Sequence, residues 1–151
     1  MTGYNPVLFD SNILVYAHNL DSPFYKKAKE LHEQVVFKNL RGVIANQNLL
    51  EFYSTITNSR LVSRPQTAQK AHRSCLAYLK SGFKIIYPKE NDLQNTLYLA
   101  EKESISGRKI FDLYLIATML SNNVDTIYTA NEKDFKDFSE IKAINPFIKQ
   151  G

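Results

Sequence analysis

The sequence predicts an α/β protein in which a central parallel sheet is covered by helices on both faces. Short apolar runs of strand length alternate with longer amphipathic segments along the whole chain. Consecutive strands that are separated by helices normally pair in parallel through right-handed crossovers. No repeat, low-complexity tract or linker interrupts the 151 residues, so we expect a single domain over residues 1–151.

The predicted strands are short and mostly apolar. They cover residues 6–10, 43–46, 83–88, 126–130 and 142–146, which gives a sheet of about four to five strands. The first strand ends in an acid and leads directly into a helical turn or two at residues 11–19.

The longer helices are expected between these strands. They cover residues 22–37, 47–58, 64–80, 91–104 and 109–120. Ser22 is the expected N-cap of the first, because Pro23 then occupies the first helical position, where no backbone donor is needed. In the helix at 64–80 the expected apolar stripe is Ala68, Ala71, Cys75, Leu76 and Leu79.

Composition narrows the class of protein. Apolar residues make up 44% and charged residues 23% of the chain, as in folded globular proteins. We see no signal peptide and no apolar run long enough to span a bilayer, and Cys75 is the only cysteine. These features favour a cytoplasmic protein without a membrane partner. The net charge of +4 leans toward an anionic partner such as nucleic acid.

Polar residues follow two of the predicted strands at the edge where a parallel α/β sheet binds ligands. Asp10 ends the first strand, and Thr129 and Asn131 follow a later one. Asp112 begins the last long helix, where the positive helix N-terminus favours a carboxylate.

Asp112 is the most unexpected of the acids. At 100° per residue it shares a helix face with Leu115, Ile116 and Met119. A carboxylate on an apolar face is unfavourable unless something pairs with it. We therefore favour a functional role, although a side chain that turns back to the first backbone amides of its helix is the alternative.

The other acids also have ordinary explanations. Asp10 could cap the helix that follows it. Glu51 falls on the polar side of its helical wheel, with Gln47 and Thr55, as a solvated glutamate would. Asp134 could be a loop acid or the cap of a last turn.

Other chemistries lack their usual motifs. The three histidines, His18, His32 and His72, have no metal-ligand spacing, which argues against a zinc site. The sequence contains no G-x-S-x-G, G-x-x-x-x-G-K-[ST] or G-x-G-x-x-G motif. Oxygen ligands from the acids therefore remain the main candidate chemistry.

Four segments together resemble the PIN domain family, and more closely its VapC-type toxin ribonucleases. They are "LFDSNILVYA", "NQNLLEFYSTI", "GRKIFDLYLIATML" and "IYTANEKDF", which stand in the family's order and spacing over essentially the whole chain. The resemblance implies a three-layer α/β/α sandwich around the parallel sheet. A haloacid-dehalogenase-like phosphatase is disfavoured, because that family needs a second Asp where this chain has Asn12.

The resemblance implies an acidic active site. Its acids would be Asp10, Glu51, Asp112 and, as a possible fourth, Asp134. The fourth position stays open, because Asn131 stands where many relatives carry an acid and could act through its amide oxygen. The polar residues that support the site in relatives correspond to Ser11, Asn12 and Thr129.

A bound Mg²⁺ or Mn²⁺ would explain these acids. We expect Asp10 and Asp112 to be its direct ligands, since Mg²⁺ takes one or two protein carboxylates and keeps several waters. Glu51 and Asp134 would act through water or hold a second ion, and the sequence cannot count the ions. Basic residues flank the acids and could hold RNA, or could be solvated surface charge: Arg108, Lys109, Lys133 and Lys136.

The implied function is an Mg²⁺- or Mn²⁺-dependent endoribonuclease, the toxin of a toxin–antitoxin pair. Its partners would be RNA, a small antitoxin protein and a second copy of the chain in a homodimer. A non-catalytic RNA-binding or scaffold module and a housekeeping RNA-processing nuclease are the alternatives.

Overall fold

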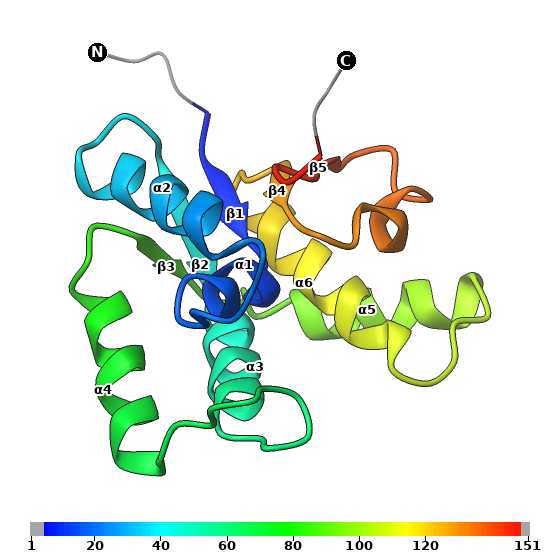
Figure 1. Cartoon of the computed structure of the whole chain (residues 1–151). Coiled ribbons are helices and arrows are strands. Elements are labelled where there is room, and N and C mark those ends of the chain that lie inside the picture. Colours follow the sequence, from blue (N-terminus) through cyan, green and yellow to red (C-terminus); the bar gives the residue numbers. More distant parts are fainter. Residues whose placement is uncertain (1–4, 149–151) are drawn as a thin grey trace.

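A five-stranded parallel sheet forms the centre of the computed structural model, which describes residues 5–148 (Figure 1). Its strands are β1 (Val7–Phe9), β2 (Gly42–Ala45), β3 (Lys84–Ile86), β4 (Thr126–Tyr128) and β5 (Lys142–Ile144). Their order is β3-β2-β1-β4-β5, and all neighbours are parallel. The first strand, β1, is therefore the middle strand of the sheet. β2 and β3 extend the sheet toward one edge, and β4 and β5 then extend it toward the other.

Helices cover both faces of this sheet, as the sequence predicts. They are α1 (Ser11–Tyr16), α2 (Tyr25–Val36), α3 (Asn46–Ile56), α4 (Ala68–Leu79), α5 (Asp92–Lys102) and α6 (Lys109–Ser121). A short 3₁₀ helix, η1 (Glu132–Phe135), precedes β5. Figure 1 shows α2 and α4 on one side of the sheet and α5 and α6 on the other. The three-layer α/β/α sandwich is therefore confirmed.

The alternation of strand side chains produces two hydrophobic cores. Phe9 and Ile44 pack against helices α1 to α4 on one face. Their chain neighbours Leu8 and Val43 point to the other face and pack with residues of α6. Both faces are apolar because both are covered, which explains why these strands read as continuous apolar runs.

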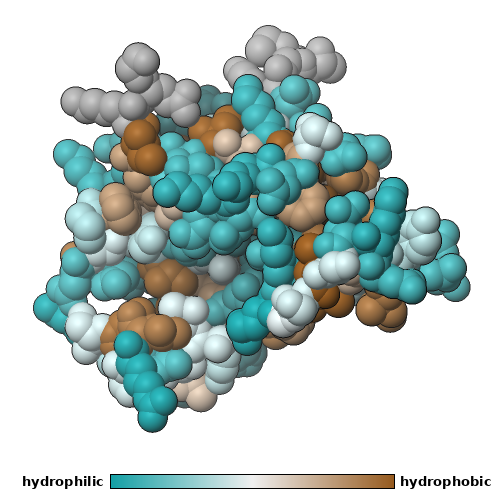
Figure 2. All heavy atoms as spheres, turned by 90° about the vertical axis from the view of Figure 1, so that its right-hand side faces the viewer, coloured by the Kyte–Doolittle hydropathy of each residue, from teal (hydrophilic) through white to brown (hydrophobic). Residues whose placement is uncertain are grey.

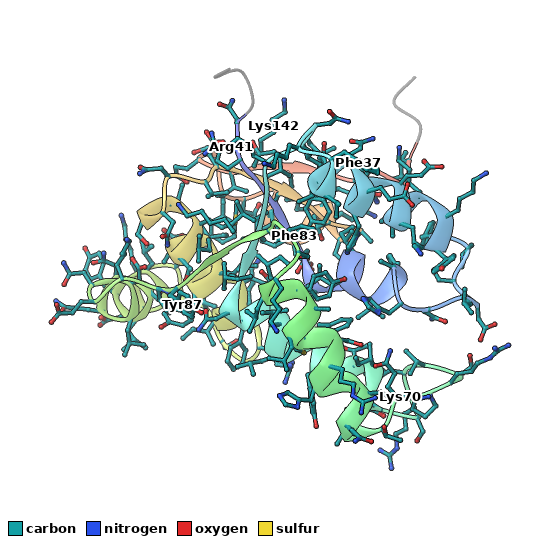
Figure 3. All side chains as sticks on the ribbon, turned by 90° about the vertical axis from the view of Figure 1, so that its left-hand side faces the viewer. Phe37, Arg41, Lys70, Phe83, Tyr87 and Lys142 are labelled. Atoms are coloured by element: carbon teal, nitrogen blue, oxygen red, sulfur yellow. The ribbon has the colours of Figure 1, made fainter. Side chains whose placement is uncertain are left out.

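Gly42 allows α2 and β3 to approach β2 closely. A Cβ atom at this position would lie 2.6 Å from side-chain atoms of both Phe83 and Val35. Phe83 precedes β3 and points into the interior (Figure 3). The glycine is therefore required by packing, and it begins β2 rather than preceding it.

Two details of the helices differ from the sequence prediction. Helix α2 begins at Tyr25, because the Ser22 hydroxyl accepts a hydrogen bond from the Phe24 amide at 3.1 Å and closes a turn before the helix. On α4 the expected stripe is only partly right: Ala71 is buried and Cys75 packs against the core, but Ala68, Leu76 and Leu79 are exposed, and Tyr78 is buried instead. Periodicity of apolar residues alone did not reveal that Tyr78 has hydrogen-bond partners in the interior.

Those partners form a polar cluster inside the first core. The Nε2 atom of His32 lies 2.8 Å from the Tyr78 hydroxyl, and its Nδ1 atom lies 2.7 Å from the Ala28 carbonyl. Because a carbonyl only accepts, Nδ1 carries the proton and Nε2 accepts from Tyr78. Burial lowers the pKa of His32 to about 4, so its ring is neutral at pH 7. Both ring nitrogens of His32 and the Tyr78 hydroxyl therefore have hydrogen-bond partners, and none of these groups is charged.

The described helices include none that is both long and apolar enough to cross a membrane. The face that carries α5 and α6 is mainly hydrophilic, with hydrophobic side chains in separate patches (Figure 2).

Candidate active site

Asp10 lies at the carboxyl end of the middle strand. Pairing of Phe9 with Tyr128 places it beside Thr129, which follows β4. The Thr129 hydroxyl donates to Asp10 Oδ2 at 2.7 Å, and the Ser11 amide donates to Oδ1 at 2.8 Å. Asp10 is therefore the N-cap of α1 and also a residue of the pocket described next, so its two predicted interpretations are compatible.

A pocket of about 360 Å³ opens at this edge of the sheet. All four predicted acids line it, and they come from four separate segments of the chain: Asp10, Glu51, Asp112 and Asp134. Ser11, Asn12 and Asn131 also line it. The structure thus brings the four predicted acids together in one pocket.

Thr129 and Asn12 form the support behind Asp10. Thr129 is fully buried, and its hydroxyl also accepts from the Asn131 amide at 3.0 Å. The side-chain amide nitrogen of Asn12 lies 3.4 Å from both Asp10 Oδ2 and the Thr129 hydroxyl, and its Oδ1 accepts from the Ala130 amide at 3.3 Å. These bonds tie the loop after β4 to the start of α1 and hold the Asp10 carboxylate in one orientation.

Glu51 is half-buried on α3 rather than solvated. Gln47, one turn earlier, donates to Glu51 Oε1 at 3.3 Å and to the Phe111 carbonyl at 3.1 Å. Gln47 therefore links α3 to the first turn of α6, next to Asp112. The helical wheel predicted that this polar side of α3 would be exposed to bulk solvent. In the structure Glu51 and Thr55 of that side line the pocket instead.

Asp112 and Asp134 line the pocket from two different helices. Asp112 is half-buried in the first turn of α6, and Asp134 is exposed in η1. Leu115, Ile116 and Met119 are buried as the wheel predicted, so Asp112 does stand at the edge of an apolar helix face.

Burial and the charges of neighbouring acids raise the pKa values of Asp10, Glu51 and Asp112. Burial is the main cause for Asp112, whose pKa rises to about 6, and the charges of Asp134 and Asp10 add to it. Burial also raises the pKa of Glu51, with further contributions from Asp10 and Asp112. Burial raises the pKa of Asp10, opposed by its hydrogen bonds from Thr129 and Ser11. The pocket thus disfavours negative charge until a cation compensates it.

This donor set fits a divalent cation that needs few protein ligands. Among the described residues, no group of three or more His, Cys, Asp or Glu side chains is arranged so that it could hold a metal ion by itself. Mg²⁺ does not need such a cage, because it keeps several waters and binds one or two carboxylates. The pKa values of Asp10, Glu51 and Asp112 all respond to the charges of other acids of the pocket, and all three side chains are at least partly buried, so each could offer a carboxylate to such an ion.

The predicted basic residues surround the pocket rather than line it. Arg108, Lys109, Lys133 and Lys136 are all exposed within the described chain. Lys109 lies 3.8 Å from Asp137, and its charge lowers the pKa of Asp112. Arg108 lies 5.7 Å from the centre of the Phe111 ring and lowers the pKa of Glu51. The charges of Arg108 and Lys109 thus reach two of the acids.

Sequence reasoning missed two residues of this region. Gln47 is only one turn from Glu51, so the i, i+4 spacing could have indicated the contact. Tyr16 lines the pocket at the end of α1, and its pKa is raised by burial and by the charge of Asp10. Nothing in the local sequence distinguishes Tyr16 from a core aromatic residue.

A family model described as the PIN domain matches residues 7–141. The chain belongs to the PIN domain family. Ribonuclease VapC24 of Mycobacterium tuberculosis is 25% identical over 142 residues, which covers 94% of this chain and 97% of that relative. The match to this PIN domain thus extends over nearly the whole of both chains.

Solved structures share the fold at lower sequence identity. Mycobacterium tuberculosis VapC20, described as a sarcin-ricin loop cleaving toxin, superposes with a TM-score of 0.62 at 11% identity, over 89% of this PIN domain and 98% of VapC20. A toxin–antitoxin complex from Klebsiella pneumoniae gives a TM-score of 0.59 at 18% identity, over 95% of this chain and 99% of the other.

Proposed function

We propose that this PIN domain is an endoribonuclease that hydrolyses RNA phosphodiesters with Mg²⁺ or Mn²⁺. One observation carries the proposal: four acids from four separate segments line one pocket, and the pKa values of Asp10, Glu51 and Asp112 are raised by burial and by the charges of neighbouring acids. Neighbouring carboxylates disfavour one another's ionisation. A divalent cation that binds together with an anionic substrate compensates this repulsion.

Asp10 and Asp112 are the proposed metal ligands. Asp10 is held from behind by Thr129 and Ser11, so its carboxylate is already oriented before an ion binds. Asp112 reaches the same pocket from the first turn of α6. When bound, a divalent ion supplies polarisation of a phosphoryl oxygen and a lower pKa for a coordinated water.

Glu51 is the proposed base or orienting group for the attacking water. Its raised pKa brings it closer to the pH at which it can accept a proton and release it again. Gln47 fixes one carboxylate oxygen, which leaves the other to face the pocket. Asp134, or the amide of Asn131, would act in the outer shell of the ion through water.

The exposed basic residues around the pocket are proposed to attract and hold the RNA backbone. Because they are not part of the lining, their replacement should weaken RNA binding more than the chemical step. Charge reversal at Lys133, which has no effect on the acids' hydrogen bonds, is the simplest variant for this purpose.

We further propose that the protein is the toxin of a toxin–antitoxin pair and acts in the cytoplasm as a homodimer. The names of its relatives support the toxin role, since they are described as a ribonuclease, as a cleaving toxin and as a toxin–antitoxin complex. Expression should therefore arrest growth, and co-expression of a small protein encoded next to it should restore growth. Light scattering of the purified protein would report the oligomeric state.

The deciding experiment is cleavage of a mixed RNA pool by purified protein in Mg²⁺, in Mn²⁺ and in EDTA. We expect discrete cuts that need the cation and that disappear in Asp112→Asn. Asp125→Asn is the matched control, because Asp125 is an exposed acid that precedes β4 at the opposite edge of the sheet. Equal cutting by the two variants, or RNA binding without any metal-dependent cutting, would refute the proposal and leave a binding module.

A further inference from the structure

An aromatic cluster lies beside the acidic pocket and is not used by the proposed chemistry. It joins three segments: Tyr16 at the end of α1, Phe24 before α2 and Phe147 after β5. The ring centres of Phe24 and Phe147 are 4.7 Å apart, and Tyr16 lies 5.1 Å from Phe24 and 5.4 Å from Phe147. All three side chains are only half-buried, so ring surface remains open to solvent.

A hollow of about 510 Å³ is formed by two of these rings. Its described lining consists of Pro23, Phe24, Lys27, Pro146, Phe147 and Ile148. The lining contains one cation, Lys27, and no acid. An aromatic wall next to a single positive charge matches a planar base attached to a phosphate, because the ring stacks on the wall while the cation meets the anion.

Tyr16 connects this hollow to the acidic pocket. It lines the acidic pocket itself, and its ring contacts both phenylalanines of the hollow. The two linings have no described residue in common, but Tyr16 of the acidic pocket packs directly against two rings of the hollow, so the two sites are neighbours. A nucleotide chain whose phosphate is held at Asp10 and Asp112 can continue past Tyr16 and reach the hollow with a neighbouring base.

We propose that Phe24 and Phe147 form a stacking platform for an unpaired base of the RNA, with Lys27 at that nucleotide's phosphate. The inference rests on the proposed ribonuclease function and narrows its substrate. A base can stack on protein rings only when it is free of its own helix, so the cut site would lie in a loop, a bulge or a single strand. Since every base has a flat face, the platform would tolerate different bases.

The test uses short single-stranded RNAs that carry 2-aminopurine, a fluorescent adenine analogue, at each position in turn. They are bound in Mg²⁺ to Asp112→Asn, which holds the RNA uncut. We expect strong quenching at one or two positions next to the cut phosphate. Replacing that base by an abasic site should weaken binding by about tenfold, the order expected for one lost stack.

Variants of Phe147 separate stacking from simple packing. Phe147→Leu keeps apolar volume but removes the ring, so quenching and the preference for a base over an abasic site should both disappear. Phe147→Trp should restore both. Phe37→Leu is the matched control, because Phe37 is 70% exposed at the end of α2 and stands outside the described lining of the hollow (Figure 3).

The outcomes distinguish this inference from the function on which it depends. If the parent cuts RNA but Phe147→Leu retains the quenching and the preference for a base, the platform is refuted while the ribonuclease stands. If the parent neither binds nor cuts any RNA, the proposed function fails and the platform fails with it. Melting temperatures of all variants show whether the fold is intact.

Discussion

Two groups of titratable side chains lie inside this protein, and they differ in the groups that surround them. His32 and Tyr78 are buried between α2 and α4, and each polar atom finds a neutral partner within the chain. At the carboxyl edge of the sheet, Asp10, Glu51 and Asp112 have other acids as their neighbouring charges. The hydrogen bonds of the first group are all made within the chain. The negative charges of the second group are disfavoured unless a cation binds beside them. The two groups thus differ in whether the chain itself supplies the partners of their polar atoms, and the proposed function assigns chemistry only to the second.

Asp112→Asn should have the largest effect of all the variants on the cleavage rate. It should also distinguish the two groups most clearly, because activity and stability should change differently. Loss of a proposed metal ligand should lower the cleavage rate by at least about 100-fold. In EDTA at pH 7 the melting temperature should stay the same or rise, because the substitution removes a carboxylate that its neighbours disfavour. Cleavage assays and thermal melts measure both; a clear fall in melting temperature would show that Asp112 stabilises the fold.

Tyr78→Phe should give the reverse result. It leaves the Nε2 atom of His32 buried without its partner at 2.8 Å, which costs about 1–3 kcal/mol of stability. The melting temperature should fall by several degrees, while the cleavage rate measured well below the melting temperature should match that of the parent. A large loss of activity in the folded variant would contradict the separation of the two groups.

Thr129→Val tests the support of the acidic group. It removes the 2.7 Å hydrogen bond to Asp10 that lowers the pKa of this carboxyl. The pKa of Asp10 should rise, so the pH at which cleavage reaches half its maximum should move upward, with a loss of activity of about tenfold below it. Thr129→Ser keeps the hydroxyl and should restore the parent profile, which a purely steric explanation would not predict.

The acids and His32 should respond to pH with opposite signs. Asp112 has a folded pKa of about 6, above its ordinary value of 3.8, so the folded chain binds more protons between these values. In EDTA this contribution to stability is lost as the pH rises from about 4 to 6. Mg²⁺ binds the ionised form, so it should raise the melting temperature more at pH 7 than at pH 5. An equal rise at both pH values would contradict a carboxylate site.

For His32 the folded pKa of about 4 lies below the ordinary value of 6.5. The unfolded chain therefore binds more protons between these values, and stability is lost as the pH falls from about 6.5 to 4. His32→Gln should flatten this acid-side loss, whereas Asp112→Asn should steepen the net rise in stability with pH. Melting curves at a series of pH values in EDTA would check both slopes.

Most of the fold could be predicted from the sequence, because strand and helix patterns depend on local periodicity. The errors concern what a single polar group does in three dimensions. Ser22 closes a turn instead of capping α2, and Tyr78 is buried because His32 meets its hydroxyl. A pattern of apolar residues contains no information on either of these hydrogen bonds.

The acids of the site were predictable for different reasons. Asp10 and Asp112 stand at the ends of strongly apolar elements, which makes a carboxylate there conspicuous. Glu51 lies on a polar helix side, and only the packing of α3 against the rest of the site turns that side toward the pocket. Tyr16 joins the site through contacts that no local pattern indicates, whereas the i, i+4 spacing of Gln47 and Glu51 indicates their contact but not the bond from Gln47 to Phe111. The assigned roles of all these residues, and of the surrounding basic residues, stay predictions.

The order of the strands has a consequence for the synthesis of the protein. β1 comes first from the ribosome but lies in the middle of the sheet, and its neighbour β4 begins only at Thr126. Asp112 and Thr129, which complete the surroundings of Asp10, belong to the same late part of the chain. A nascent chain therefore cannot assemble the acidic pocket until α6, β4 and η1 have all been synthesised. If the proposed activity holds, the ribosome and message that produce this nuclease are spared until the last strands have left the exit tunnel.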